Sequence, residues 1–293
     1  RGPMRVVSSV ESDIHENDTL EVSYKYGGYL LHREGLGSLG FRMLSTTDNQ
    51  SGVVTTTTYN QDTDKTSNGY ATIGMPETTI QNAWDGTKLS ESKNFYKVQS
   101  TANGGLFSYV ESAVDIQYAI HSLDANDQAI SSQLAKTENT NRYDSWGNLT
   151  TSTINIYEGG VLDLTSGLLK HSTVTVNTYG DGDSFYKEKG RLTNSTVTKS
   201  TDLTTAPTRA SQFTYYQSQE QCSNYIGMLK SSTVNGLTTS YCYNSFGQKT
   251  STSVSGKLNI GDTQNTTLTS SIEYSDNGRF IKSTTSSSGM VTT

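Results

Sequence analysis

The chain has 293 residues, of which 17% are charged and 32% hydrophobic, and its formal net charge is −6. It shows no basic stripe and no long apolar run, so we expect neither nucleic-acid binding nor a membrane span. Disorder is also excluded, because 18 Tyr and regularly placed Val and Ile accompany the polar Thr and Ser. With only 3 Pro, the composition favours β-sheet whose turns use Gly, Asn and Asp.

The chain opens with RGPM at positions 1–4, which we interpret as the remnant of a cleaved expression tag. Residues 35–40 then contain G-x-G-x-x-G, the spacing of a dinucleotide-binding fingerprint. That fingerprint requires a helix directly after the glycines, whereas the segment that follows is rich in Thr and Val, which favour strands. We therefore interpret these glycines as a connection between strands, and we expect no cofactor.

Residues 118–136, YAIHSLDANDQAISSQLAK, leave two structures open. Their apolar residues recur at near-helical spacing, which predicts a short helix. The alternative is a long hairpin that turns around LDANDQ, with one strand on each side of this polar stretch.

The second half of the chain contains a repeat. Aligned on a glycine, six copies share the pattern G-x-[L/K/F]-x-x-[S/T]-[S/T]-[V/I/T], and in four copies a tyrosine stands four residues before the glycine. Each copy predicts a strand, a tight turn and a second strand, because apolar and polar residues alternate on either side of a glycine-containing bend. The structural residues of this repeat are Tyr143, Gly147, Gly167, Tyr186, Gly190, Gly227, Tyr243, Gly247, Tyr274 and Gly278.

Spacing within the repeat raises a question about the strand that follows each glycine. The apolar positions two and seven residues after the glycine differ by five, so they cannot share one face of a regular strand. Either a β-bulge lies between them or both faces of the strand contact something. With either answer we predict an all-β fold, an extended, twisted, mostly antiparallel sheet of repeated hairpins.

The stretch YDSWGNLT at 143–150 and its relatives resemble the YD repeat of bacterial Rhs proteins. In the first quarter, GLGSLGF, LSTTDNQSG, VVTTTTYNQD and IGMPETT resemble the region before the repeats in Rhs-type proteins and in the B components of insecticidal toxin complexes. Two departures are Ser38, where the family has phenylalanine, and the insertion-like TDKTSNGY. The resemblance implies a pre-repeat β segment over 5–85 and a continuous repeat region over 86–293, and it favours the hairpin over 118–136.

The resemblance further implies a structural scaffold without catalysis, one arc of the hollow β-shell that such proteins form around a toxic polypeptide. Its partners would be the rest of the parent shell and the enclosed toxin. Its place would be secreted or at the bacterial cell surface, after assembly in the cytoplasm. Because a piece of such a sheet presents open edges, we also expect edge-to-edge self-association. The family's toxic C-terminus and the cleavage site before it have no counterpart up to Thr293.

The two cysteines, Cys222 and Cys242, lie 20 residues apart, and each stands five residues before a repeat glycine. Equivalent positions in successive repeats can come close in a sheet, which allows a disulfide when the Cα atoms lie within about 7 Å. The alternative is a pair of buried thiols, because the related proteins are assembled in a reducing cytosol. Both alternatives stay open at this point.

Tyrosine, histidine and aspartate are the remaining residue types that could bind a ligand. The repeated tyrosines suit stacking on sugar rings, which gives an alternative function, an extracellular carbohydrate- or receptor-binding module. Aromatic pairing across strands is the structural interpretation of the same residues. The four histidines have no partner at metal-ligand spacing, and Asp181 and Asp183 lack the further ligands of a calcium loop. We therefore expect no metal site and no enzyme.

Overall fold

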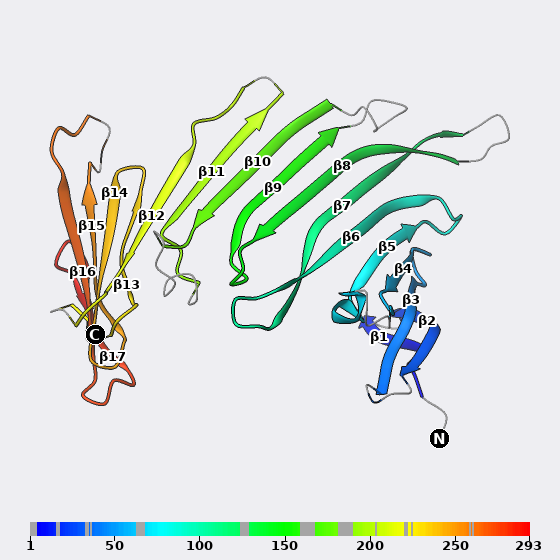
Figure 1. Ribbon diagram of the computed structural model, residues 1–293, viewed down its shortest axis with the longest axis horizontal. Helices are drawn as coiled ribbons and strands as arrows, with labels where there is room; N and C mark the ends of the chain where they lie inside the picture. The colour runs from blue at the N-terminus through cyan, green and yellow to red at the C-terminus, as the bar shows by residue number, and fades with distance from the viewer. Residues whose placement is uncertain are drawn as a thin grey trace. The chain divides into compact units, whose positions relative to one another are not determined.

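The computed structural model describes residues 5–15, 18–32, 35, 37–62, 68–123, 129–158, 168–180, 190–202, 204–219, 222–223, 225–257, 259 and 261–293. These residues form one open antiparallel sheet of 18 strands, with a short 3-10 helix (Figure 1). In the resolved registers, each strand pairs with its neighbour in sequence, as β1 does with β2 and β13 with β14. The predicted all-β sheet of hairpins is therefore confirmed.

The chain divides into two compact units, Arg1–Val174 with Lys199–Thr205, and Thr175–Thr198 with Ala206–Thr293. Within the first unit lie β1 (Ser9–His15), β2 (Asp18–His32), β3 (Gly37–Asp48), β4 (Val54–Tyr59), η1 (Asn68–Thr72), β5 (Pro76–Asn82), β6 (Lys88–Ser100), β7 (Leu106–Leu123), β8 (Ala129–Tyr143) and β9 (Leu149–Glu158). The unit boundaries fall within β10 (Leu168–Thr178) and β11 (Asn194–Thr201). The second unit continues with β12 (Arg209–Tyr215), β13 (Leu229–Val234), β14 (Leu237–Tyr243), β15 (Lys249–Gly256), β16 (Thr266–Tyr274), β17 (Ile281–Thr285) and β18 (Val291–Thr292).

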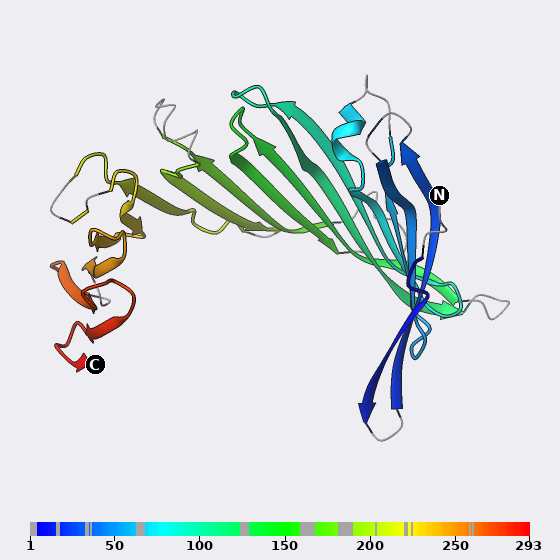
Figure 2. The same cartoon turned by 90° about the horizontal axis from the view of Figure 1, so that it is seen from below.

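Long hairpins dominate the first unit, where β6, β7 and β8 hold 13, 18 and 15 residues and lie side by side (Figure 2). Residues 118–123 and 129–136 belong to β7 and β8, which pair antiparallel, so the hairpin prediction is confirmed and the helical alternative is wrong. Gly35 lies between β2 and β3, whereas Gly37 and Gly40 already belong to β3. The glycines therefore stand where two strands are joined, as expected, and a strand follows them.

Shorter strands, of six to nine residues in β12 to β16, make up most of the second unit. Because cross-strand partners share a face and side chains alternate along a strand, the registers sort these side chains into two faces. The hydroxyl face carries mainly Ser and Thr, including Thr214, Ser231, Thr233, Thr238, Ser240, Ser251, Ser253, Thr267 and Thr269. The opposite face, here called the repeat face, carries Phe213, Val234, Leu237, Tyr241, Val254, Leu268 and Ile272.

A β-bulge lies next to the repeat turns and resolves the spacing question. Cys242 pairs with Ser251 but Tyr243 pairs with Lys249, so Thr250 is an extra residue on the strand after the glycine. One extra residue between the positions two and seven after the glycine brings both onto the same face of the sheet. The same register shift occurs next to Tyr143, Tyr215 and Tyr274.

Few side chains of this sheet are deeply buried. Among the apolar residues that the structure describes, Tyr109 is 8% exposed and Tyr216 is 3% exposed, one in each unit, and the polar Ser223 is 2% exposed. The rest of the stability of the sheet comes from backbone hydrogen bonds between strands and from cross-strand side-chain pairs. Ser45 and Thr72 in the first unit are buried as well, at 9% and 5% exposed, so the buried side chains among the described residues are few and partly polar.

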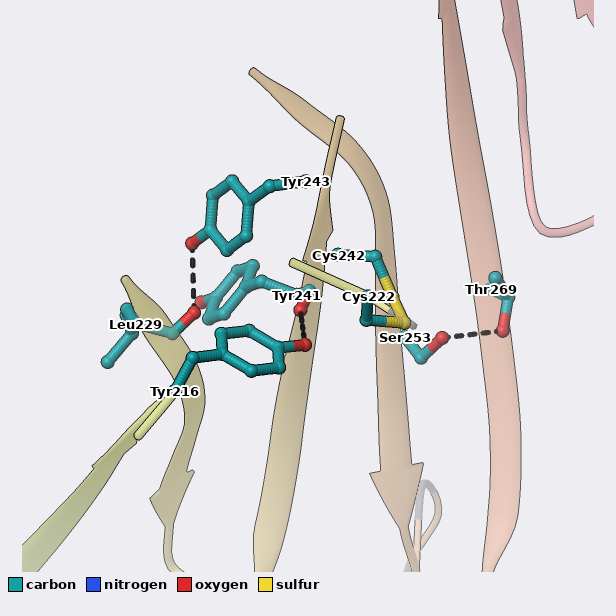
Figure 3. The surroundings of a disulfide bond; sticks show 8 residues. All are labelled: Tyr216, Cys222, Leu229, Tyr241, Cys242, Tyr243, Ser253 and Thr269. Atoms are coloured by element: carbon teal, nitrogen blue, oxygen red, sulfur yellow. Dashed lines mark hydrogen bonds between the residues drawn. A yellow bond between two sulfur atoms is a disulfide. The ribbon is translucent and has the colours of Figure 1, made fainter. Parts of the chain in front are cut away.

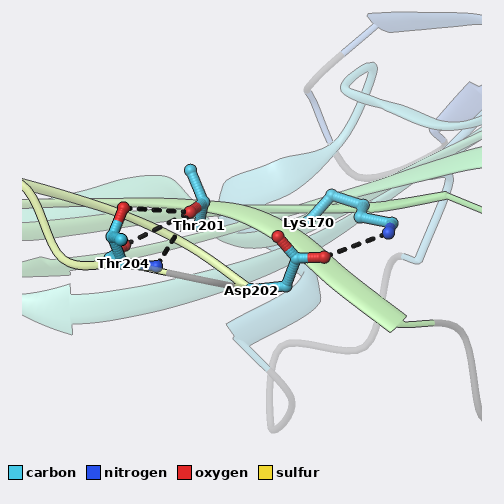
Figure 4. Close-up of polar contacts among 4 residues, drawn as sticks. All are labelled: Lys170, Thr201, Asp202 and Thr204. Atoms are coloured by element: carbon cyan, nitrogen blue, oxygen red, sulfur yellow. Dashed lines mark hydrogen bonds and ion pairs between the residues drawn. The ribbon is translucent and has the colours of Figure 1, made fainter.

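The turn that ends β11 belongs to the first unit and is fixed by short polar contacts (Figure 4). The N–H of Thr204 donates to Oγ1 of Thr201 at 3.1 Å, and the N–H of Thr201 donates to the carbonyl of Thr204 at 2.7 Å. Nζ of Lys170 on β10 lies 3.1 Å from Oδ2 of Asp202 in this turn. Since both side chains are about one-third exposed (30% and 36%), the ion pair contributes at most about 1 kcal/mol.

Candidate functional site: the glycine turns

The described repeat glycines share one backbone conformation. Their φ angles lie between 63° and 85°, in the left-handed region that glycine reaches without a steric penalty. In the turns at 147, 247 and 278, the N–H of the glycine donates to the carbonyl three residues earlier, at 2.7 to 3.1 Å. The repeat glycines with this positive φ are Gly147, Gly190, Gly227, Gly247 and Gly278.

The residue three positions before the glycine stabilises two of these turns with its side chain. Oδ1 of Asp144 accepts the backbone N–H groups two and four residues further on, both at 2.9 Å. Oδ1 of Asn244 accepts the corresponding N–H groups, both at 3.0 Å. Asp and Asn form such side-chain turns readily, so the stretches DSWG and NSFG encode the same bend locally.

Side chains that directly follow a repeat glycine connect one turn to the next in the second unit. Nε of Arg191 donates to the carbonyl of Gly227 at 2.8 Å. Nε2 of Gln248 donates to the carbonyl of Gly278 at 2.5 Å. Each of these bonds joins turns that are separated by two strands, which the backbone ladder alone does not link. We call this row of turns the glycine-turn edge; it comprises Gly190, Gly227, Gly247 and Gly278.

Aromatic rings also lie against the turn glycines. The hydroxyl of Tyr225 donates to the carbonyl of Ser245 at 2.6 Å, and a Cβ at Gly247 would lie 3.6 Å from the Tyr225 ring. A Cβ at Gly278 would lie only 3.0 Å from the ring of Phe246. The missing side chain thus permits a close approach of a neighbouring ring, in addition to the positive φ.

The Gly147 turn of the first unit is held by the preceding turn in a similar way. Nε2 of Gln99 donates to the carbonyl of Asp144 at 2.6 Å, and the N–H of Ala102 donates to the carbonyl of Ser145 at 2.7 Å. The ring of Phe107 lies against the glycine, 3.8 Å from where a Cβ would be. Each unit therefore contains hydrogen bonds that tie one turn to the next.

The described repeat tyrosines are engaged within the sheet. The hydroxyls of Tyr243 and Tyr274 donate to the carbonyls of Leu229 and Lys249, at 2.9 and 3.0 Å. The ring of Tyr143 contacts two neighbouring aromatic rings. Burial raises the pKa of the Tyr243 hydroxyl, and the neighbouring tyrosines add to this effect. This arrangement favours a structural role for these tyrosines over contact with sugars.

Four residues considered from the sequence, Gly167, Asp181, Asp183 and Tyr186, lie outside the described residues. Among the described ones, the repeat pattern did not single out Arg191 or Gln248, whose bonds join neighbouring turns. A signal for both exists, since each is a long polar side chain directly after a repeat glycine. Their partners cannot be found from the sequence, because the bonds reach 36 and 30 residues along the chain.

Cys222 and Cys242 form a disulfide, with Cα atoms 4.4 Å apart (Figure 3). Cys222 lies in the connection between β12 and β13, and Cys242 lies on β14. The hydroxyl of Tyr216, in the same connection, donates to the carbonyl of Tyr241 on β14 at 2.7 Å (Figure 3). The disulfide thus stands among hydrogen bonds that hold this connection against β14.

A hollow of about 410 Å³ lies in the first unit between the β4–β5 connection and β6. Its polar groups serve the fold, since Asn94 and Tyr96 both donate to the carbonyl of Pro76, at 3.1 and 2.7 Å. The ammonium group of Lys93 lies 5.0 Å from the ring centroid of Phe95. Over the described residues, no group of three or more His, Cys, Asp or Glu side chains is placed to hold a metal ion. No helix found in that part of the chain is long and apolar enough to cross a membrane.

The fold is similar to that of solved structures, although the sequence matches no protein-family model and no curated protein. Among solved structures, the chain is similar to TcdB2-TccC3, a toxin complex with an Rhs-repeat shell, with a TM-score of 0.60 and 8% sequence identity over 93% of this chain. It is also similar to TcdB2-TccC3 without its hypervariable C-terminal region, with a TM-score of 0.54 and 8% identity over 92% of the chain. At this identity the likeness concerns the fold.

The chain spans 20% of the length of these two solved chains. The fold likeness agrees with the resemblance that the glycine repeat and the pre-repeat segments carry.

Proposed function

We propose that this chain is a non-catalytic wall segment of a hollow β-shell that encloses a toxic polypeptide in a bacterial toxin of the Rhs/Tc type. One observation carries the proposal: the fold of TcdB2-TccC3 extends over 93% of the chain. The repeat that resembles the YD repeat forms the turns of that same sheet. The partners are then the remainder of the shell and the enclosed polypeptide.

The glycine turns stabilise the strand ends of such a wall. A single sheet with little buried apolar area depends on its cross-strand hydrogen bonds, which open most readily at strand ends. The bonds from Arg191 to Gly227 and from Gln248 to Gly278 tie those ends together over two strands. Opening one hairpin therefore also breaks a contact to the next turn, and the wall resists local opening without a second layer.

In this proposal the parent protein is assembled in the bacterial cytoplasm and reaches the exterior or the cell surface with its contents enclosed. Enclosure separates the polypeptide from proteases and from other proteins until release. The wall itself performs no reaction; one of its two faces contacts the enclosed polypeptide and the other faces the exterior.

The test uses the full-length parent protein, with a photo-crosslinking amino acid, p-benzoyl-phenylalanine, placed at a single position. Thr267→p-benzoyl-phenylalanine labels the hydroxyl face, and Leu268→p-benzoyl-phenylalanine labels the repeat face of the same strand. Both side chains are exposed here, so neither substitution disturbs a core. The samples are irradiated, treated with trypsin in the native state, and then denatured for mass spectrometry.

We expect one of the two positions to crosslink to a polypeptide that survives trypsin, and the other to yield no such product, because a wall has one inner face. Crosslinks from both faces, or from neither, would contradict enclosure. A parent protein that contains no trypsin-resistant polypeptide would contradict it as well.

A further inference from the structure

The connection between β12 and β13 is held against β14 by several contacts on its described residues, 216–219, 222–223 and 225–228. The N–H of Tyr243 donates to the carbonyl of Cys222 at 2.7 Å. The hydroxyl of Tyr216 donates to the carbonyl of Tyr241, and the hydroxyl of Tyr225 donates to the carbonyl of Ser245. The disulfide adds a covalent bond at the centre of this set (Figure 3).

Burial marks this connection off from the rest of the second unit. Tyr216 is 3% exposed and Ser223 is 2% exposed, whereas the strands around them are half-buried or exposed. The two cysteine residues are themselves only half-buried. A small thiol reagent can therefore approach the disulfide without prior unfolding of the sheet.

The same connection joins consecutive turns of the glycine-turn edge. Gly227 accepts the bond from Arg191, and Tyr225 bonds Ser245 in the following turn. The disulfide closes a stretch of 20 residues, from Cys222 to Cys242, which contains β13. This closure removes conformational freedom from the open state of the connection and so favours its place against β14.

We propose that the Cys222–Cys242 disulfide is a redox latch, which fastens the β12–β13 connection to β14 under oxidising conditions and frees it when dithiols reduce it. The inference goes beyond the proposed function and does not depend on it. Release weakens the link between the Gly227 and Gly247 turns, so the glycine-turn edge becomes discontinuous at this point. The strand pairing of the first unit is unaffected.

The chemical step is ordinary thiol–disulfide exchange. One thiolate of a dithiol attacks a cysteine sulfur, the S–S bond between the two cysteines breaks, and a mixed disulfide forms. The second thiol of the reagent then displaces that cysteine and closes a cyclic disulfide. Two electrons pass from the dithiol to the protein, and its two protons end on the thiols of Cys222 and Cys242.

The first measurement is thiol titration of the denatured chain, prepared without reductant. We expect no reactive thiol before treatment with dithiothreitol and two per chain afterwards. Two free thiols in the untreated protein would overturn the proposal, because no latch would then exist.

The second measurement is hydrogen exchange of the native protein with and without dithiothreitol. On reduction we expect the amide of Tyr243, which bonds Cys222, to exchange at least about tenfold faster, since the connection opens more often. The amide of Ala102, which joins two turns of the first unit, is the matched control and should not change. Unchanged exchange at Tyr243, or an equal increase at both amides, would contradict a local latch.

The double variant Cys222→Ser/Cys242→Ser gives an independent readout. Its Tyr243 amide should exchange fast in both conditions and show no response to dithiothreitol. If the variant does not fold, the reduced wild-type protein, returned to oxidising conditions, must recover the slow exchange. Failure to recover would overturn the reversible latch.

Discussion

The two buried aromatic side chains among the described residues, Tyr109 and Tyr216, lie one in each unit, and their sites are built differently. Tyr109 in the first unit packs its ring against Phe107 and Tyr143, with centroids 5.3 and 4.5 Å apart. Tyr216 in the second unit lies in a connection rather than in a strand, and its hydroxyl bonds the backbone of Tyr241. Beside it stands the disulfide.

Strand length explains the difference. The 18 residues of β7 and the 15 of β8 bring aromatic rings from neighbouring strands together at the Gly147 turn. The second unit has strands of six to nine residues in this region and covers its turn by folding the preceding connection back. The repeat therefore specifies the turn, while most of the residues that cover the turn come from outside the repeat pattern.

The largest effect is expected from removing the two buried rings. Tyr216→Ala and Tyr109→Ala should each lower the free energy of unfolding of their own unit by about 3 kcal/mol or more, as for other buried aromatic residues. Tyr216→Phe should lose only about 1 kcal/mol, the worth of one hydrogen bond. Urea unfolding, followed by limited proteolysis of each unit, measures both. Equal effects of Tyr216→Ala on the two units would contradict a role of this ring confined to the second unit.

A smaller effect is expected at the glycines. Gly236→Ala places a Cβ in open space at a φ of 81°, which should cost about 1 kcal/mol. Gly227→Ala has a similar φ but also collides with the guanidinium group of Arg191, so about 1 kcal/mol more should be lost with that hydrogen bond. In an Arg191→Ala background this excess should disappear. A persistent excess in the double-mutant cycle would show that the turn-to-turn bond is not its cause.

Alkaline pH should destabilise the second unit through Tyr243, whose ring lies beside that of Tyr216. Burial raises the pKa of Tyr243 above its ordinary value of 10.0, so the folded chain holds that proton more tightly than the unfolded chain. The resulting stability is fully present below pH 10 and is lost as the pH rises through the folded pKa. Tyr243→Phe should therefore make the alkaline loss of stability shallower. Urea unfolding from about pH 8 to about pH 11 tests this, and a slope equal to that of the wild type would contradict it.

The smallest effect is expected on the hydroxyl face. The hydroxyls of Ser253 and Thr269 lie 2.8 Å apart and are exposed, so water replaces the bond when one is removed. Thr269→Val keeps the branched shape that suits a strand and should change the free energy of unfolding by less than about 0.5 kcal/mol. A loss above 1 kcal/mol in urea unfolding would mean that hydroxyl pairs, rather than the Tyr216 site, hold this unit.

Much of the fold could be predicted because its signals are local. The alternation of polar and apolar residues, the glycine with its small polar neighbours, and the lack of Pro all act within a few residues. The side-chain turns at Asp144 and Asn244 are of this kind, since each accepts N–H groups no more than four residues away. Even the bulge was one of two alternatives that the spacing left open, and the register decided between them.

The sequence by itself thus determined an all-β sheet of hairpins with glycine at its turns, because strand and turn preferences depend on near neighbours. Only the tertiary structure decided what those turns contact. The side chain of Arg191 bonds a carbonyl 36 residues away, and Cys222 bonds Cys242 at a sequence separation of 20 residues. Such contacts follow from strand register and connection length together, and a change of one residue in either would bring a different residue to the same place.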